Sequence, residues 1–140
     1  MSFVATWTVL TDDGANSGGE LVVSTAQDID TLLDALNSPG ATAALIRHTN
    51  RAAVPDGSGG MVPDHDMSAG VWQGYGYLTY TDTEHEYETL TGDPDSPAYP
   101  AHYVEYDAGT GVDLPTLRQA LVEFLHTAQR PTSVAWQPAV

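Results

Sequence analysis

Apolar and polar residues alternate over residues 3–10, which predicts a strand with one buried face because successive side chains of a strand point to opposite sides. Residues 11–19 are rich in Asp, Asn, Ser and Gly and are expected to form a loop. A short strand is then expected over 20–23. The face of the first strand that we expect to be buried carries Phe3, Ala5, Trp7 and Val9.

Two later segments show the three- and four-residue spacing of an amphipathic helix. Thr25 and Asp28 form a capping-box pattern at the start of the first, and the Asn-Ser-Pro-Gly run at 37–40 ends it. Asp113 is an N-cap for the second, which we expect to end just before Pro131. The two apolar stripes consist of Ile29, Leu32, Leu33 and Leu36, and of Leu114, Leu117, Leu121, Phe124 and Leu125.

The remaining pattern predicts strands that are joined mostly by hairpins, one of them turning at Gln73-Gly74. Hairpin-joined strands with two segregated helices indicate an α+β fold, with a mostly antiparallel sheet of five or more strands and both helices packed on it. Trp136 is expected to be largely buried, and 1–140 to form a single domain. Further strands are expected at 43–46, 67–71, 75–80, 85–90, 101–106 and 132–136, and loops at 50–63 and 91–100.

Composition narrows the class of protein. An apolar content of 41% over 140 residues suits a globular domain rather than a disordered chain. No cysteine is present, so disulfides and thiolate metal sites are excluded. The N-terminus lacks the pattern of a signal peptide, and no run approaches the ~20 apolar residues that span a bilayer. We therefore expect a cytoplasmic protein that makes no membrane contact.

Charge is the strongest compositional feature. Nineteen carboxylates face four arginines and no lysine, which gives a formal net charge of −15. Such a surface repels phosphate backbones and anionic lipids, so direct nucleic-acid binding is not expected. It attracts a basic partner and speeds the encounter. Acidity of this degree also serves solubility, and the two interpretations are compatible.

The sequence contains no complete motif for catalysis or cofactor binding. Without lysine there is no P-loop and no Schiff-base chemistry. The Gly57-Ser58-Gly59-Gly60 run lacks the glycine that a nucleophile elbow needs at position 56. The Asp64-His65-Asp66 run does not continue as a calcium loop, because Ala69 and Tyr75 stand where glycine and glutamate are required. We expect no catalytic residue, no metal and no cofactor.

A row of carboxylates follows the central hairpin. On an extended strand Glu84, Glu86 and Glu88 would share one face at about 7 Å spacing, with His85 and Tyr87 facing the sheet. Such a row is most typical of a solvated face and next of a docking surface for a basic partner. Acid–base catalysis is the least expected of the three interpretations. Exposed aromatics beside it would anchor an interface. The candidate partner-binding residues are Tyr75, Tyr77, Tyr80, Asp82, Glu84, Glu86, Glu88, Asp93 and Asp95.

The end of the chain carries a recognisable pattern. Residues 117–125 read Leu-Arg-Gln-Ala-Leu-Val-Glu-Phe-Leu, and residues 130–137 read Arg-Pro-Thr-Ser-Val-Ala-Trp-Gln. An acid-capped helix ending in Glu-Phe, followed by Arg-Pro-x-x-Val-x-Trp-Gln, resembles the C-terminal pattern of the type 1 immunity proteins of bacterial polymorphic toxin systems, which are common in actinobacteria. The match is close over 113–137 and looser upstream, and the pattern itself is expected to be structural.

This resemblance implies an immunity protein, not an enzyme, that binds and neutralises a cognate toxin and protects the producing cell. Family members are often encoded beside toxins of the nucleic-acid deaminase type, which implies a partner with a basic substrate cleft. From the charge, we expect the acidic surface to occupy that cleft as a mimic of nucleic acid. Two alternatives are a small hydrolase or isomerase with a His/Asp site, and a non-enzymatic adaptor domain.

Overall fold

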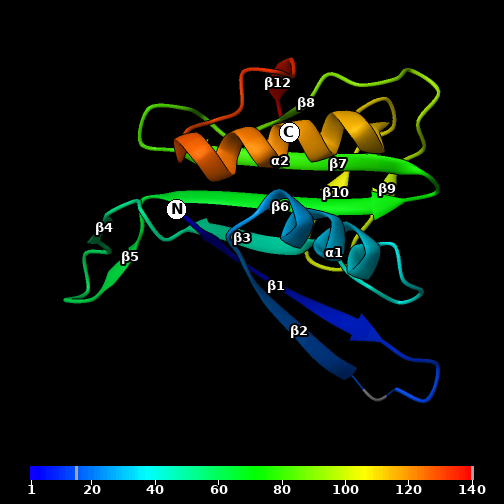
Figure 1. Cartoon of the computed structure of the whole chain (residues 1–140), viewed down its shortest axis with the longest axis horizontal. Helices are drawn as coiled ribbons and strands as arrows, with labels where there is room; N and C mark the ends of the chain where they lie inside the picture. The colour runs from blue at the N-terminus through cyan, green and yellow to red at the C-terminus, as the bar shows by residue number, and fades with distance from the viewer. Residues whose placement is uncertain (15, 140) are drawn as a thin grey trace.

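The computed structural model describes residues 1–14 and 16–139, which form a main sheet with two helices on one of its faces and two small separate hairpins (Figure 1). The elements are β1 (Phe3–Leu10), β2 (Asn16–Val23), α1 (Ala26–Leu36), β3 (Ala44–His48), β4 (Ala53–Pro55), β5 (Met61–Pro63), β6 (His65–Trp72), β7 (Tyr75–Asp82), β8 (Glu88–Leu90), β9 (Tyr99–Pro100), β10 (Glu105–Tyr106), β11 (Val112–Asp113), α2 (Leu114–Thr127) and β12 (Trp136–Pro138). The main sheet has the order β12-β8-β7-β6-β3-β1-β2, and β11 pairs with β7 as its eighth strand. Every pairing among the described strands is antiparallel, which confirms the predicted α+β class.

The helices cover one face of the sheet through the two predicted apolar stripes. Thr25 and Asp28 form the expected capping box at the start of α1, and the Asp113 carboxylate accepts a hydrogen bond from the Thr116 N–H at the start of α2. Both caps satisfy amide groups that have no partner inside the helix. The helix-side core consists chiefly of Ile29, Leu32 and Leu36 of α1, Leu117, Leu121 and Phe124 of α2, and Phe3, Met67, Leu78 and Tyr80 of the sheet.

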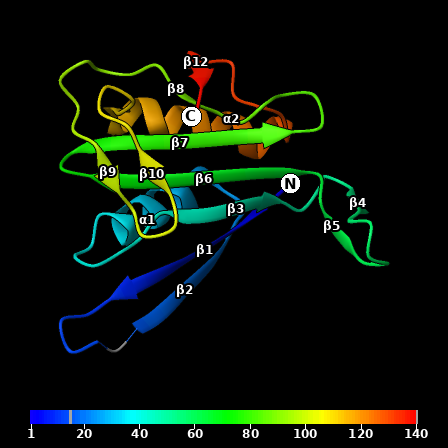
Figure 2. The same cartoon turned by 180° about the vertical axis from the view of Figure 1, so that it is seen from behind.

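The β6–β7 hairpin forms the centre of the sheet. Gln73 and Gly74 both have positive φ, 51° and 85°, as a two-residue turn of type I′ requires. Alternation along β7 places Leu78 toward the helices and Tyr77 toward the opposite face. On that opposite face the β9–β10 hairpin covers part of the sheet (Figure 2). Two tyrosines of this hairpin, Tyr99 and Tyr106, form a second core with Tyr77.

Several predicted boundaries are wrong, each for a local reason. β2 begins at Asn16 inside the predicted loop, because the glycines there permit packing: a Cβ at Gly19 would lie 2.3 Å from the Trp7 ring. α2 ends at Thr127, because Ala128 adopts a left-handed conformation (φ 58°) three residues before Pro131. The strand predicted at 101–106 is instead the turn and second strand of the β9–β10 hairpin. A further hairpin, β4–β5, lies within the loop predicted at 50–63.

The segment after α2 is tied to the helix by one side chain. The Glu123 carboxylate accepts hydrogen bonds from the Thr132 N–H and hydroxyl, at 2.6 and 2.8 Å, and from the Ser133 N–H at 2.9 Å. The chain therefore remains irregular through Ala135, and the last strand begins only at Trp136. Trp136 is partly buried, less than expected, and its indole N–H donates to the Pro131 carbonyl.

Close packing of α2 on β7 depends on Gly76. A Cβ at this position would lie 2.6 Å from both Cβ and Cδ2 of Leu117. We expect Gly76→Ala to lower the free energy of unfolding by about 1–3 kcal/mol through overpacking. Gly18→Ala in β2 is the matched control, because its Cβ would meet only the Trp7 carbonyl oxygen at 3.6 Å. Urea unfolding of both variants measures the difference, and equal stabilities would contradict this account of the packing.

Candidate partner-binding site

Two of the three tyrosines proposed for partner binding are not surface residues. Tyr77 and Tyr80 are fully buried, and Tyr75 is partly buried. The Tyr77 hydroxyl donates to the Pro97 carbonyl at 2.6 Å, so its polar end is satisfied inside the protein. The expectation that Tyr77 and Tyr80 lie exposed beside the carboxylates is therefore wrong.

The carboxylate row is also arranged differently from the prediction. Residues 83–87 form bends, and only Glu88 lies in a strand, so Glu84, Glu86 and Glu88 do not line one strand face. Tyr87 is 46% exposed. We call residues 83–88 the acidic loop.

The acidic loop still gathers its carboxylates around one shallow hollow. Glu84 and Glu86 are exposed, whereas Glu88 is partly buried and forms an ion pair with Arg130. The hollow has a volume of about 250 Å³ and is lined by Glu84, His85, Glu86, Glu88, Arg130 and Pro138.

Asp93 and Asp95 are exposed but do not extend this patch. Glu88 pairs with Tyr80 near the end of β7, while the Asp93 N–H donates to the Gly111 carbonyl, beside Tyr75 at the start of β7. Tyr80 and Tyr75 lie five residues apart in β7, so about 17 Å of strand separates the two groups. The predicted acidic surface is thus divided between the two ends of the sheet.

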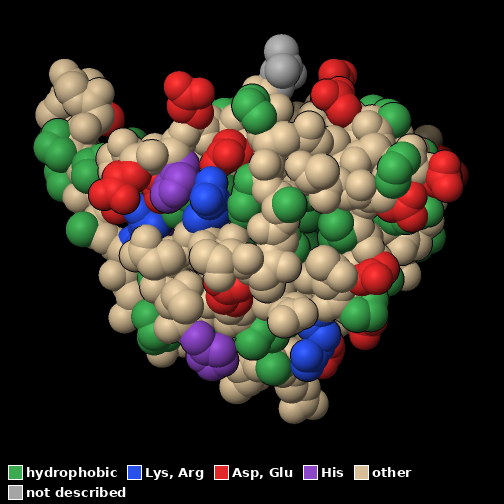
Figure 3. All heavy atoms as spheres, turned by 90° about the horizontal axis from the view of Figure 1, so that it is seen from above, with side chains coloured by type: hydrophobic (Ala, Val, Ile, Leu, Met, Phe, Trp, Pro, Cys, Tyr) green, Lys and Arg blue, Asp and Glu red, His purple; other side chains and the backbone are tan. Residues whose placement is uncertain are grey.

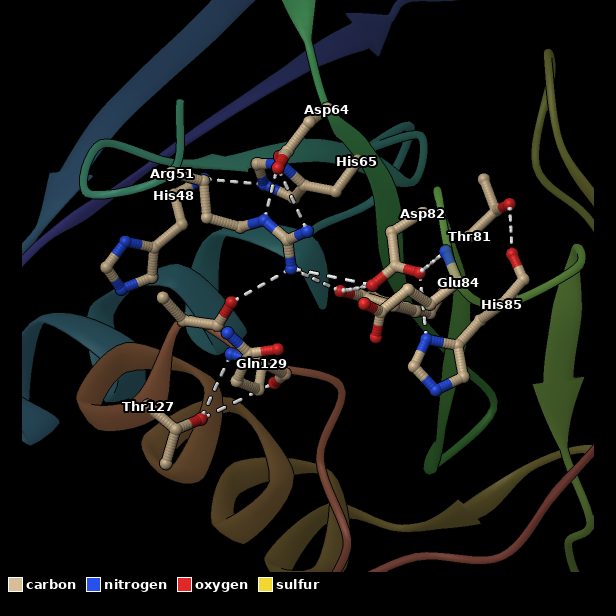
Figure 4. Close-up of polar contacts among 12 residues, drawn as sticks. His48, Arg51, Asp64, His65, Thr81, Asp82, Glu84, His85, Thr127 and Gln129 are labelled. Atoms are coloured by element: carbon tan, nitrogen blue, oxygen red, sulfur yellow. Dashed lines mark hydrogen bonds and ion pairs between the residues drawn. The ribbon is translucent and has the colours of Figure 1, made fainter. Parts of the chain in front are cut away.

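A buried arginine organises the end of the sheet that carries the acidic loop (Figure 4). Arg51 precedes β4 and Asp64 follows β5, and the guanidinium holds both carboxylate oxygens of Asp64 at 2.7 and 3.1 Å. Its Nη1 donates to the Tyr80 hydroxyl at 2.7 Å and to the Ala128 carbonyl at 3.0 Å. The same nitrogen lies 3.5 Å from a carboxylate oxygen of Asp82.

Asp82 connects this arginine to the acidic loop. Its carboxylate accepts hydrogen bonds from the Tyr80 hydroxyl, from the Glu84 N–H and from His85 Nδ1. Burial raises the pKa of Asp82, but the hydrogen bonds from Tyr80, Glu84 and His85 outweigh burial and lower this pKa to about 2. An ionised Asp82 therefore bends the chain after β7 and gives the acidic loop its shape.

Two histidines of the same network have both ring nitrogens engaged. His65 Nε2 accepts from the His48 N–H, so the proton lies on Nδ1, which donates to Asp64. His48 Nδ1 accepts from the Asn50 N–H, so its Nε2 donates to the Leu125 carbonyl. Burial lowers the pKa of His65 and favours this neutral form, against the opposing hydrogen bond of Asp64. These contacts are structural, and neither ring offers a free nitrogen for proton transfer.

Sequence reasoning missed Arg51, Asp64 and Arg130 as parts of this site. The Asp64-His65-Asp66 run resembles a metal motif in the sequence, whereas in the structure Asp64 and His65 take part in the arginine network. No group of three or more side chains able to hold a metal ion is found among the residues the structure describes. One signal was available: Arg51 and Asp64 bracket the Gly/Pro-rich segment, and arginine is rare in this chain.

Replacing Arg51 by lysine tests how much the hydrogen bonds of its guanidinium group contribute to stability. A single ammonium cannot reproduce the paired bonds to Asp64 together with those to Tyr80 and Ala128. We expect Arg51→Lys to lower the free energy of unfolding by about 2–4 kcal/mol. Arg118→Lys is the matched control, because Arg118 also holds Asp30 through two bonds but is 42% exposed. The control should change stability by less than about 0.5 kcal/mol in urea unfolding, and similar losses would contradict the assignment.

The lowered pKa of Asp82 predicts an acid-sensitive contribution to stability. Because the folded-state pKa is about 2 and the ordinary value is 3.8, the ionised carboxylate stabilises the fold above about pH 4. The contribution is lost as the pH falls through the folded-state pKa. The difference in unfolding free energy between the native protein and Asp82→Asn should shrink by about 2 kcal/mol between about pH 5 and pH 2. A constant difference in urea unfolding across that range would refute the linkage.

Comparison with known proteins supports the resemblance seen in the sequence. The sequence profile of the immunity protein Imm1 family matches residues 17–138, which include both helices and the strands from β3 to β12. No curated protein sequence matches the chain. Within the described residues, neither helix is long and apolar enough to cross a membrane. The match covers most of the chain and confirms the predicted family. The chain belongs to the immunity protein Imm1 family.

Proposed function

We propose that this immunity protein binds and neutralises a cognate toxin domain through its acidic loop, and that it acts by binding rather than by catalysis. The observation that carries the proposal is the exposure of Glu84 and Glu86 on a loop whose shape is fixed by Asp82. A loop that is already ordered loses little conformational entropy on binding. It therefore suits a role as a contact surface.

The distribution of charge supports a basic partner. Of the four arginines, Arg51, Arg118 and Arg130 are held in ion pairs with carboxylates of the protein. In the part of the chain that the structure describes, these pairs involve four of the nineteen carboxylates, Asp30, Asp64, Asp82 and Glu88. In the space-filling view, acidic side chains gather around histidine and arginine side chains at the end of the molecule that carries β4 and β5 (Figure 3). This field would attract a positively charged surface and accelerate the encounter.

The partner chemistry that fits best is a toxin that handles nucleic acid. An enzyme acting on a polyanion, such as a nucleic-acid deaminase, needs a basic cleft for the phosphate backbone. The exposed carboxylates of the ordered acidic loop can occupy such a cleft in place of the nucleic acid. Inhibition of this kind is stoichiometric, so one equivalent of immunity protein should abolish toxin activity, whereas a catalytic protector would act at lower ratios.

Charge reversal of the acidic loop tests the proposal. We expect Glu84→Lys/Glu86→Lys to slow association with the toxin domain encoded beside the gene by about 10-fold at low salt. The dependence of the association rate on salt should also become weaker, because fewer opposite charges steer the encounter. Stopped-flow association at two salt concentrations, with a catalytically inactive toxin domain, provides the measurement.

The far end of the sheet supplies a matched control. Asp95→Lys/Asp107→Lys makes the same change in net charge at exposed positions remote from the acidic loop. This variant should lose less than about threefold in association rate, because screening weakens charges beyond a Debye length. Both variants should keep the native unfolding free energy within about 0.5 kcal/mol. Equal slowing by the two variants would mean that net charge alone matters, and would refute a localised interface.

A further inference from the structure

A small hairpin beside the acidic loop presents apolar side chains to solvent. β4 and β5 pair only with each other, as a separate two-stranded sheet, and with the turn between them they project from the body of the protein (Figures 1 and 2). We call residues 53–63 the arm. Met61 and Val62 on the arm are 62% and 40% exposed. An isolated two-stranded ribbon of this length is marginal in water, so its conformation needs external support.

That support comes from both ends of the arm. At the base, the two hydrogen bonds between Arg51 and Asp64 join the residues that flank the arm. At the tip, the Asp56 carboxylate accepts hydrogen bonds from the N–H and hydroxyl of Ser58 and from the Gly60 N–H. The arm is thus held in one shape although its apolar side chains cover no core. Apolar groups presented on an ordered element bind at a smaller entropic cost than those on a flexible loop.

Hollows on the protein surface continue the apolar character of the arm. One, with a volume of about 420 Å³, lies over the open face of β1 and β3 and is lined in part by Val4, Leu45 and Pro63. Another, of about 320 Å³, is lined in part by Met61 and Val62 themselves. Leu45 is 45% exposed on the same sheet face. The arm and the sheet beside it therefore offer a partner both a projecting apolar ribbon and a concave surface.

The arm and the acidic loop belong to one continuous surface. His65, just after the arm, pairs with Asp82, just before the acidic loop. Arg51 binds Asp64 at the base of the arm and lies 3.5 Å from Asp82. A further hollow is lined by residues from both sides of this junction, including Val54 of the arm and Thr83 of the acidic loop. A partner that docks on the acidic loop therefore meets the arm.

The charge around the arm indicates the kind of partner. Exposed Asp56, Asp66, Glu84 and Glu86 lie on or near the arm. Of the two arginines nearby, Arg51 is paired with Asp64, and Arg47 has no ion pair in the described structure. A second copy of this chain carries the same net charge of −15, so charge repulsion opposes self-association through this surface. A basic protein combines charge attraction to the rim with burial of Met61 and Val62.

We propose that the arm is the apolar anchor of the toxin interface, with Met61 and Val62 entering a cleft of the basic toxin domain while the acidic loop forms the charged rim. This inference rests on the proposed function and assigns separate tasks to the two elements. Rim charges govern the association rate, whereas desolvated apolar anchors govern the dissociation rate. The two elements are therefore distinguishable by kinetics.

The experiment replaces the anchor without changing charge. Met61→Ser/Val62→Ser should dissociate from the inactive toxin domain encoded beside the gene about 30-fold faster than the native protein, with an association rate within about twofold. Leu10→Ser is the matched control: Leu10 is a 37% exposed apolar residue at the opposite end of β1, and its loss should leave both rates unchanged. Urea unfolding should place all variants within about 0.5 kcal/mol of the native protein.

The possible outcomes separate the two proposals. Failure of the native protein to bind the toxin domain would overturn the proposed function and this inference with it. Native binding together with unchanged dissociation of Met61→Ser/Val62→Ser would overturn the role of the arm and leave the proposed function standing. Sedimentation velocity provides a further check. If the native protein is a dimer and Met61→Ser/Val62→Ser is a monomer, the arm serves self-association and the inference is overturned.

Discussion

One guanidinium group holds together the end of the molecule on which the proposed function depends. Arg51 contacts Asp64 after β5, Tyr80 in β7 and the Ala128 carbonyl at the end of α2. Its side chain is only 10% exposed, so loss of the charge would leave two largely buried carboxylates, Asp64 and Asp82, without their cation. The base of the arm, the start of the acidic loop and the end of the helix are therefore fixed by the same few bonds. An exposed ion pair could not impose that geometry.

The tyrosines show how a sequence rich in aromatic residues can be misread as an interface. β7 has a core on each side: Tyr80 packs under the helices, and Tyr77 packs against Tyr99 and Tyr106 of the opposite layer. Their hydroxyls find partners within the protein, as when Tyr106 meets the Ser68 hydroxyl at 2.8 Å. A tyrosine whose polar end is satisfied internally can be buried fully. The second layer is thus built from aromatic side chains on short hairpins rather than from a helix.

Local sequence signals predicted the elements of the fold well. Contacts between residues far apart in the chain could not be predicted from the sequence. The capping box at Thr25, the Asp113 cap and the Gln73-Gly74 turn each depend on residues a few positions apart, and each is found as predicted. The Arg51–Asp64 pair joins residues thirteen positions apart across a segment with no periodicity. The acidic row alternated like a strand, but the hydrogen bonds of Asp82 to the chain beyond it bend that segment. Side-chain chemistry overrode the pattern there.

The C-terminal pattern that identifies the family also contributes a residue to the candidate site. The pattern is therefore more than a structural scaffold. Arg130 follows α2 in the chain and forms an ion pair with Glu88. It therefore fixes the C-terminal end of the acidic loop, while Asp82 fixes the N-terminal end. Glu88 is thereby neutralised, and Glu84 and Glu86 remain exposed between two anchored points. The same architecture that seals the core thus determines which carboxylates are free to meet a partner.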